Sequence, residues 1–87
     1  MSYASSYPVL TPDQLGAVLQ ATRKAQQRTQ AEMSLHLGLS QPRVSYLERH
    51  TEEISVKQLL AWCAALSLEL SLGSRTQPEV VSASTEW

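Results

Sequence analysis

The sequence predicts a small all-α domain of four to five short helices, followed by one C-terminal β-strand that pairs across a dimer. The chain has only 87 residues, which suffices for one domain. Residues that cap helix starts recur along it, and near residue 66 the apolar spacing changes from helical to strictly alternating. We expect an N-terminal arm over residues 1–10, one domain over 11–72 and a flexible tail over 73–87.

Helix starts are marked by a hydroxyl residue followed three positions later by Gln or Glu, the pattern of a capping box. These pairs are Thr11 with Gln14, Thr29 with Glu32, and Ser55 with Gln58. Gly38 suits the turn after a helix, and Ser40 suits the cap of the next one. The predicted helices therefore cover residues 12–26, 30–37, 41–49 and 56–66.

Apolar residues recur at helical spacing in each of these segments and predict the core. They are Leu15, Val18, Leu19, Met33, Leu37, Val44, Leu47, Val56, Leu59, Leu60, Cys63 and Leu66. Cys63 is expected to be a buried thiol. Trp62 lies on or near the same face, and we expect it in the core or in a dimer contact.

The last apolar residues alternate with polar ones, which is typical of a half-buried strand. Leu66, Leu68, Leu70 and Leu72 are separated by Ser67, Glu69 and Ser71. Leu and Glu are also good helix formers, so the alternative is that the last helix simply continues. A lone strand needs a partner, and a copy of itself across a two-fold axis would supply one. The predicted dimer contacts are Leu68, Leu70, Leu72 and Trp62.

Residues 29–48 have the spacing of a helix-turn-helix, with Gly38 at the turn between the two short helices. Val44 and Leu47 face inward on a helical wheel, which leaves a polar face outward. Such a helix lies in the major groove of DNA with its first residues at the base edges. The predicted DNA-binding residues are Gln30, Ser40, Gln41, Pro42, Arg43, Ser45, Tyr46 and Arg49.

These side chains suit different parts of a DNA duplex. The amide of Gln41 can donate to and accept from adenine, Ser45 can bond several base edges, and Pro42 can touch a thymine methyl. Gln30 opens a helix whose N-terminus favours a phosphate. Arg43, Tyr46 and Arg49 suit phosphates or either role. Because proline disfavours a helical residue before it, Gln41 is an alternative cap for this helix.

Charge is distributed unevenly along a chain whose net charge is −1. Residues 1–49 carry five basic and three acidic side chains, whereas residues 50–87 carry two basic and five acidic ones. The mildly positive half contains the predicted DNA reader, and the acidic half could not usefully face phosphate. For Lys24 and Arg28, a solvated position and a DNA contact are equally open.

The stretch TQAEMSLHLGLSQPRVSYLE resembles the Xre/Cro-type family of phage repressors, and the resemblance covers residues 12–66. It implies a lambda-repressor-like fold in which Gln30 contacts phosphate and braces Gln41. It also implies a structural ion pair between Arg23 and Glu48. The sequence departs from the family pattern at Met33, at Pro42 and in the missing glycine after Arg49.

The whole layout is more closely similar to HipB-type antitoxins, since the domain is followed by LSLELSL and a tail ending in Trp87. That resemblance implies a dimeric repressor of its own operon that binds a HipA-like Ser/Thr kinase toxin. Trp87 would be the toxin-binding anchor. The alternatives are a stand-alone Xre-type regulator without a toxin, and an interaction module that has lost DNA binding.

Other activities find little support in the sequence. There is no phosphate-binding glycine loop, nucleophile elbow or acid–base pair, so we expect no enzyme and no cofactor. His36 and His50 stand without Cys or carboxylate partners at metal spacing, so we expect no metal and assign both to the surface or to caps. Without a leader, an apolar span or a second cysteine, a cytoplasmic protein with no membrane partner is expected.

Overall fold

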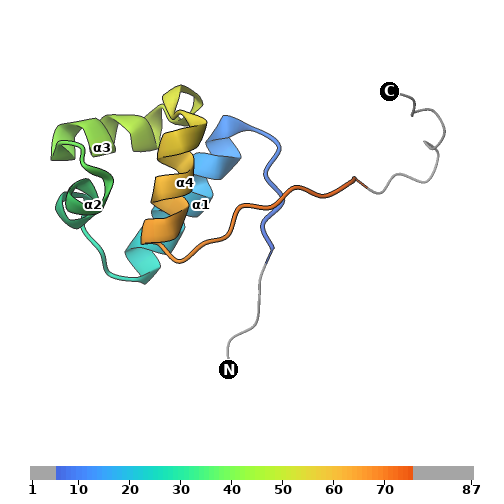
Figure 1. Cartoon of the computed structure of the whole chain (residues 1–87), viewed down its shortest axis with the longest axis horizontal. Coiled ribbons are helices and arrows are strands. Elements are labelled where there is room, and N and C mark those ends of the chain that lie inside the picture. Colours follow the sequence, from blue (N-terminus) through green and yellow to red (C-terminus); the bar gives the residue numbers. More distant parts are fainter. Residues whose placement is uncertain (1–5, 76–87) are drawn as a thin grey trace.

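The computed structural model describes residues 6–75 and places four α-helices and one short 3₁₀ helix in that range (Figure 1). They are α1 Pro12–Ala25, α2 Gln30–Leu37, α3 Gln41–Arg49, η1 Thr51–Glu53 and α4 Val56–Ala65. Helix α2 packs against α3 and α4, while α1 packs against α3 and η1. The prediction of four helices is confirmed, and each begins at the expected residue.

All four helices begin at the predicted capping side chains. The hydroxyls of Thr11, Thr29 and Ser55 accept from the backbone N–H groups of Gln14, Glu32 and Gln58, and the returning side-chain bonds complete three capping boxes. Ser40 caps α3 by accepting from the N–H of Arg43 at 3.2 Å. Each such cap stabilises a helix by about 1 kcal/mol, so the sequence signals correspond to real interactions.

Three helices end in a residue with left-handed backbone geometry, but the sequence indicated only one of them. Gly38 has φ +68° at the end of α2, as expected. Gln27 and Ser67 adopt φ +58° after α1 and α4 although neither is glycine. Backbone hydrogen bonds from the following residues, Arg28 and Leu68, reach back to close both turns.

The core lies where all four helices meet, around a tryptophan at the centre of α4. Trp62 is fully buried within a single chain, so the prediction that it contacts a dimer partner is corrected to a core position. Its indole N–H has no hydrogen-bond partner among the described residues, and its contribution is therefore apolar burial. The remaining members of the core cluster are Leu19, Met33, Val44, Leu47 and Leu66.

Helix α4 turns part of its apolar surface outward, contrary to the sequence prediction. Val56 and Leu60 are 69% and 51% exposed, although both were expected in the core. They are four residues apart and therefore lie on one side of the helix. Trp62 and Cys63 occupy the buried side.

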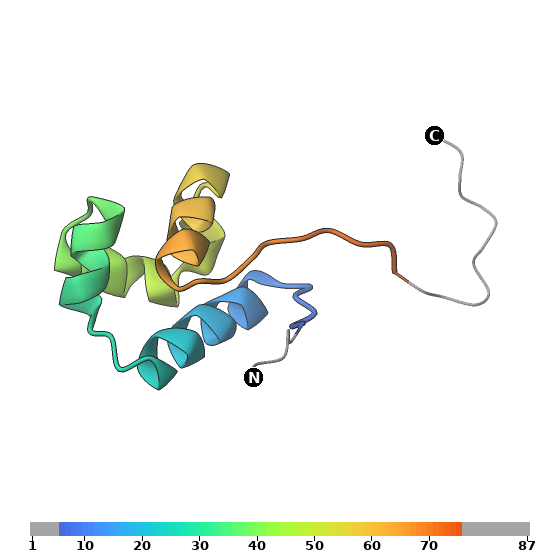
Figure 2. The ribbon, with the colours of Figure 1, turned by 60° about the horizontal axis from the view of Figure 1, so that its bottom comes forward.

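The predicted strand is not formed in the part of the chain that the structure describes, which contains no β-strand. Leu66 ends α4 within the core, and residues 68–75 run away from the helical body without regular structure (Figure 2). Leu68 still packs against the core, whereas Leu70 and Leu72 are exposed. The alternative of a continued helix is also wrong, because Ser67 turns the backbone out of the helical conformation.

Helix α1 lies against η1 at a point where no side chain fits. A Cβ atom added to Gly16 would overlap the hydroxyl of Thr51. Gly16 therefore permits the close approach that brings α1 alongside the end of α3. No helix among residues 6–75 combines the length and the apolar character that crossing a membrane requires.

Removing the central tryptophan tests the core. We expect Trp62→Ala to lower the free energy of unfolding by about 3–5 kcal/mol, because it leaves a large cavity. Leu35→Ala, at a position 85% exposed, should change it by less than about 0.5 kcal/mol. Urea denaturation measures both. An unchanged unfolding free energy for Trp62→Ala, with dissociation of a dimer instead, would restore the dimer-contact interpretation.

Candidate nucleic-acid interface

Helix α3 carries its apolar residues behind it and a polar face in front. Val44 and Leu47 are fully buried, while Gln41, Pro42 and Arg43 are exposed. Because Ser40 is the observed cap, α3 begins at Gln41, and the alternative in which Gln41 itself caps the helix is wrong. The first turn of α3 therefore points away from the body of the fold.

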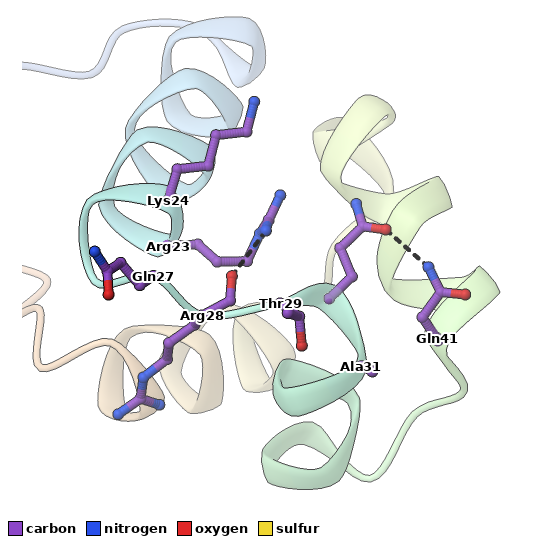
Figure 3. Close-up of a pocket in the computed structure, with 8 residues that line it drawn as sticks. Arg23, Lys24, Gln27, Arg28, Thr29, Ala31 and Gln41 are labelled. Carbon is purple, nitrogen blue, oxygen red and sulfur yellow. Dashed lines mark hydrogen bonds between the residues drawn. The ribbon is translucent and has the colours of Figure 1, made fainter.

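The side chain of Gln41 is held by the first residue of α2. Its Nε2 donates to Oε1 of Gln30 at 2.8 Å, the dashed bond that reaches Gln41 in Figure 3. The Xre/Cro resemblance implied this brace, and the structure confirms it. The bond joins the first residues of the two helices of the motif.

A buried ion pair lies directly behind this amide pair. Arg23 on α1 donates from Nε to Oε2 of Glu48 at 2.7 Å and from Nη2 to Oε1 at 3.1 Å. The two side chains are 10% and 1% exposed. This fork of two parallel bonds confirms the implied pair, and such geometry is the strong form of an Arg–carboxylate contact.

The ion pair and the amide pair are connected. Gln30 donates from Nε2 to Oε1 of Glu48 at 2.9 Å. The polar contacts therefore run without a break from Arg23 through Glu48 and Gln30 to Gln41. Sequence reasoning found both ends of this chain and missed the bond in the middle. The sequence gives only a weak indication of this bond, because Gln30 and Glu48 are 18 residues apart. They meet only when α3 packs beside α2.

A shallow depression opens beside this polar chain, at the N-terminus of α2 (Figure 3). It is lined by Arg23, Lys24, Gln27, Arg28, Thr29, Gln30, Ala31 and Gln41. Backbone N–H groups at a helix N-terminus attract anions, and exposed Lys24 adds positive charge. The surface therefore suits a phosphate next to the exposed end of α3.

Arg28 makes a structural contact that the sequence did not indicate. Its Nη1 donates to the carbonyl of Ala65 at 2.9 Å, and Gln26 donates to the carbonyl of Leu66 at 2.8 Å. Both bonds satisfy carbonyl groups at the end of α4, where a positive charge is also favourable. The turn after α1 thereby holds α4 in place.

The other end of α3 makes its own polar contacts. Arg49 donates to the hydroxyl of Ser45 at 2.8 Å. The hydroxyl of Tyr46 donates to Glu53 at 2.7 Å, and this bond to a carboxylate raises the pKa of Tyr46. Arg43 lies over the Tyr46 ring at 5.4 Å from its centroid. Tyr46 is half-buried and turned toward η1, where its hydroxyl is bonded to an acidic side chain.

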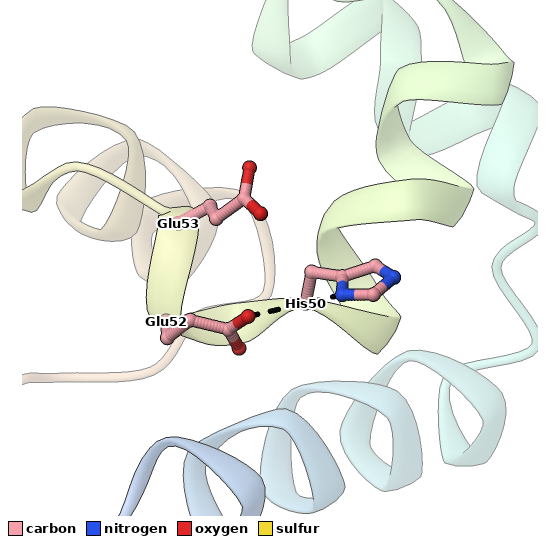
Figure 4. A group of neighbouring side chains, drawn as sticks. All are labelled: His50, Glu52 and Glu53. Carbon is pink, nitrogen blue, oxygen red and sulfur yellow. Dashed lines mark ion pairs between the residues drawn. The ribbon is translucent and has the colours of Figure 1, made fainter.

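His50 has carboxylate neighbours, contrary to the sequence expectation. Its ligand atom and those of Glu52 and Glu53 all lie within 4.8 Å of one another (Figure 4). His50 also ends α3 as its C-cap and stacks on the ring of Tyr46, so its predicted capping role is confirmed. Cys63 is buried, as predicted, and burial raises the pKa of its thiol.

Two short helices joined at a left-handed glycine, with the second exposed and braced from behind, define a helix-turn-helix fold. A model of a helix-turn-helix domain family matches residues 13–73, and the chain belongs to this family. The match includes all four helices, except for the first residue of α1, and the beginning of the extended segment. No curated protein and no solved structure matches the chain.

Removing the α1 partner of the buried ion pair tests how much the pair matters for the stability of the fold. Arg23→Met leaves the Glu48 carboxylate buried without its counter-ion, and we expect a loss of about 3–5 kcal/mol in unfolding free energy. Lys24→Met removes the same charge from the adjacent exposed position and should cost less than about 0.5 kcal/mol. Equal effects of the two substitutions in urea denaturation would contradict a structural role for the pair.

Proposed function

We propose that this protein is a sequence-specific DNA-binding transcriptional repressor that recognises double-stranded operator DNA through α3. The observation that carries the proposal is the exposed first turn of α3, held rigid by the Ser40 cap and the Gln30–Gln41 bond. A side chain whose orientation is already fixed loses less entropy when it binds a base. The helix-turn-helix family of the chain supports the same function.

The residues of this surface divide by the part of DNA that they reach. Gln41 reads a base, with Pro42 and Ser45 beside it in the groove. Arg43 and Arg49 contact phosphates, and Tyr46 packs beside them. Ser40 and Gln30 lie at the two helix N-termini, and Gln30 contacts a phosphate there while it holds Gln41.

The repressor acts as a homodimer in this proposal, with the two segments around residues 68–72 paired across a two-fold axis. Leu70 and Leu72 are 45% and 98% exposed in the single chain, which supports a partner for this segment. Unpaired backbone groups of an extended segment favour the same pairing. A dimer of this kind would bind two half-sites about 34 Å apart, one turn of the duplex.

The finer proposal is that the protein is the antitoxin of a HipA-type kinase and represses their shared operon. Its support is the layout of the chain, in which a helix-turn-helix domain precedes LSLELSL and a tail that ends in Trp87. Trp87 lies outside the described residues. The alternative is a stand-alone Xre-type regulator, which would have the same DNA-binding surface and no toxin partner.

Substituting the base reader tests recognition. On the DNA upstream of the protein's own gene, Gln41→Ala should lose about 1–3 kcal/mol of discrimination at a single base position, because one bidentate contact disappears. Binding titrations on duplexes substituted one base pair at a time measure this. Arg43→Ala is the matched control and should weaken all the duplexes alike. If Gln41→Ala instead lowered the affinity equally for every sequence, Gln41 would not be the residue that reads a base.

Shortening the chain tests the antitoxin role. Removal of residues 73–87 should abolish co-purification with the kinase encoded by the adjacent gene, while operator binding persists, because the DNA-binding surface lies within residues 30–49. Trp87→Ala should weaken kinase binding in the same direction. Unchanged capture by both variants would exclude the tail as the kinase-binding element. An adjacent gene without a kinase would favour the stand-alone regulator.

A further inference from the structure

The carboxylate of Glu48 accepts hydrogen bonds from two different side chains. Both guanidinium contacts of Arg23 and the amide nitrogen of Gln30 reach it, at 2.7, 3.1 and 2.9 Å. The Glu48 side chain is 1% exposed, so this protein environment takes the place of water around it. An ionised carboxylate can only accept hydrogen bonds.

This restriction determines which way the Gln30 amide points. Its nitrogen must face Glu48, because the amide oxygen there would place two acceptors against each other in a buried site. The oxygen of Gln30 is therefore directed toward Gln41. Gln41 must in turn present its nitrogen, and the observed bond from Gln41 Nε2 to Gln30 Oε1 has this direction.

We propose that Glu48 is a specificity-determining positioning residue, which sets the order of donor and acceptor that Gln41 presents to a base. One N–H of Gln41 is used by Gln30, and the second N–H and the oxygen remain for DNA. These two groups match the N7 acceptor and the N6 amino donor of adenine, in one order along the groove. The inference rests on the proposed operator binding and extends it to a residue that does not reach DNA.

Arg23 has a separate part in this arrangement. Its forked contact holds the carboxylate in one orientation: Oε2 accepts from Nε of Arg23, and Oε1 accepts from both Nη2 of Arg23 and Nε2 of Gln30. The ion pair thus stabilises the fold, while the carboxylate alone determines the amide direction. The family resemblance implied only the first of these roles.

The test is Glu48→Gln, which has nearly the same shape. The donors of Arg23 face both oxygens of the carboxylate, so an amide at position 48 can turn either its oxygen or its nitrogen toward Gln30. The directions of the Gln30 and Gln41 amides should then no longer be fixed. We expect the preference for adenine at the base identified with Gln41→Ala to fall by about fivefold or more. Titrations with duplexes that differ only at that base pair measure the ratio.

Two further variants separate this effect from lost stability. Arg23→Gln breaks the ion pair but keeps the carboxylate, so it should be less stable and keep the wild-type base preference. Glu48→Gln leaves the Arg23 guanidinium buried without a counter-ion and could prevent folding. Arg23→Gln/Glu48→Gln avoids this problem, because it replaces the ion pair by two neutral amides. This double variant should lose the preference, because neither amide enforces a direction.

A readout without DNA distinguishes the possible failures. The side-chain NH₂ resonances of Gln30 and Gln41 in ¹H–¹⁵N spectra should shift in both variants that lack the carboxylate and stay in place in Arg23→Gln. Specific binding by the wild type with the same base preference in all variants would overturn the proposal. The proposal would also be overturned if the Gln30 and Gln41 side-chain resonances stayed in place in the two variants that lack the carboxylate. Absence of any specific DNA binding by the wild type would refute the proposed function, and this inference with it.

Discussion

The Arg23–Glu48 ion pair is the interaction on which the rest of this structure depends. It joins α1 to the end of α3 within a small core, at a position where both charged groups are nearly excluded from water. A buried pair of this kind contributes little net stability, yet the loss of either partner is costly. Its consequence here is geometric, because the same carboxylate holds Gln30 and, through it, Gln41. The outward face of α3 is thus connected to the interior of the domain.

Around this pair, each structural contact has an effect on the exposed helix. Val44 and Leu47 hold α3 from behind, and Ser40 holds its first turn. Gly16 lets α1 lie close to η1 and to the backbone of Glu48 at the end of α3. At the far end of α3, the acidic turn at Glu52 and Glu53 places negative charge next to Tyr46. The beginning of the helix is therefore the end better suited to DNA.

Local features of the structure were predictable from the sequence, and features that depend on tertiary contacts were less so. Capping residues such as Thr29 and Ser55 act within one helical turn, so their spacing alone located the helix starts. The outward side of Val56 and Leu60 was not predictable, because the apolar pattern of α4 does not specify which side meets the core. The alternation after Leu66 predicted a strand, but a strand needs a partner, and residues 6–75 of one chain supply none. The Glu48–Gln30 bond requires α2 and α3 to be packed before it exists.

The most direct test of the central claim is a map of the residues whose backbone amide resonances move when upstream DNA is titrated into the ¹⁵N-labelled protein. Recognition through α3 predicts that the largest changes lie at residues 41–43 and at the start of α2 around Gln30. Changes confined to α4 and η1, with the first turn of α3 unaffected, would contradict it.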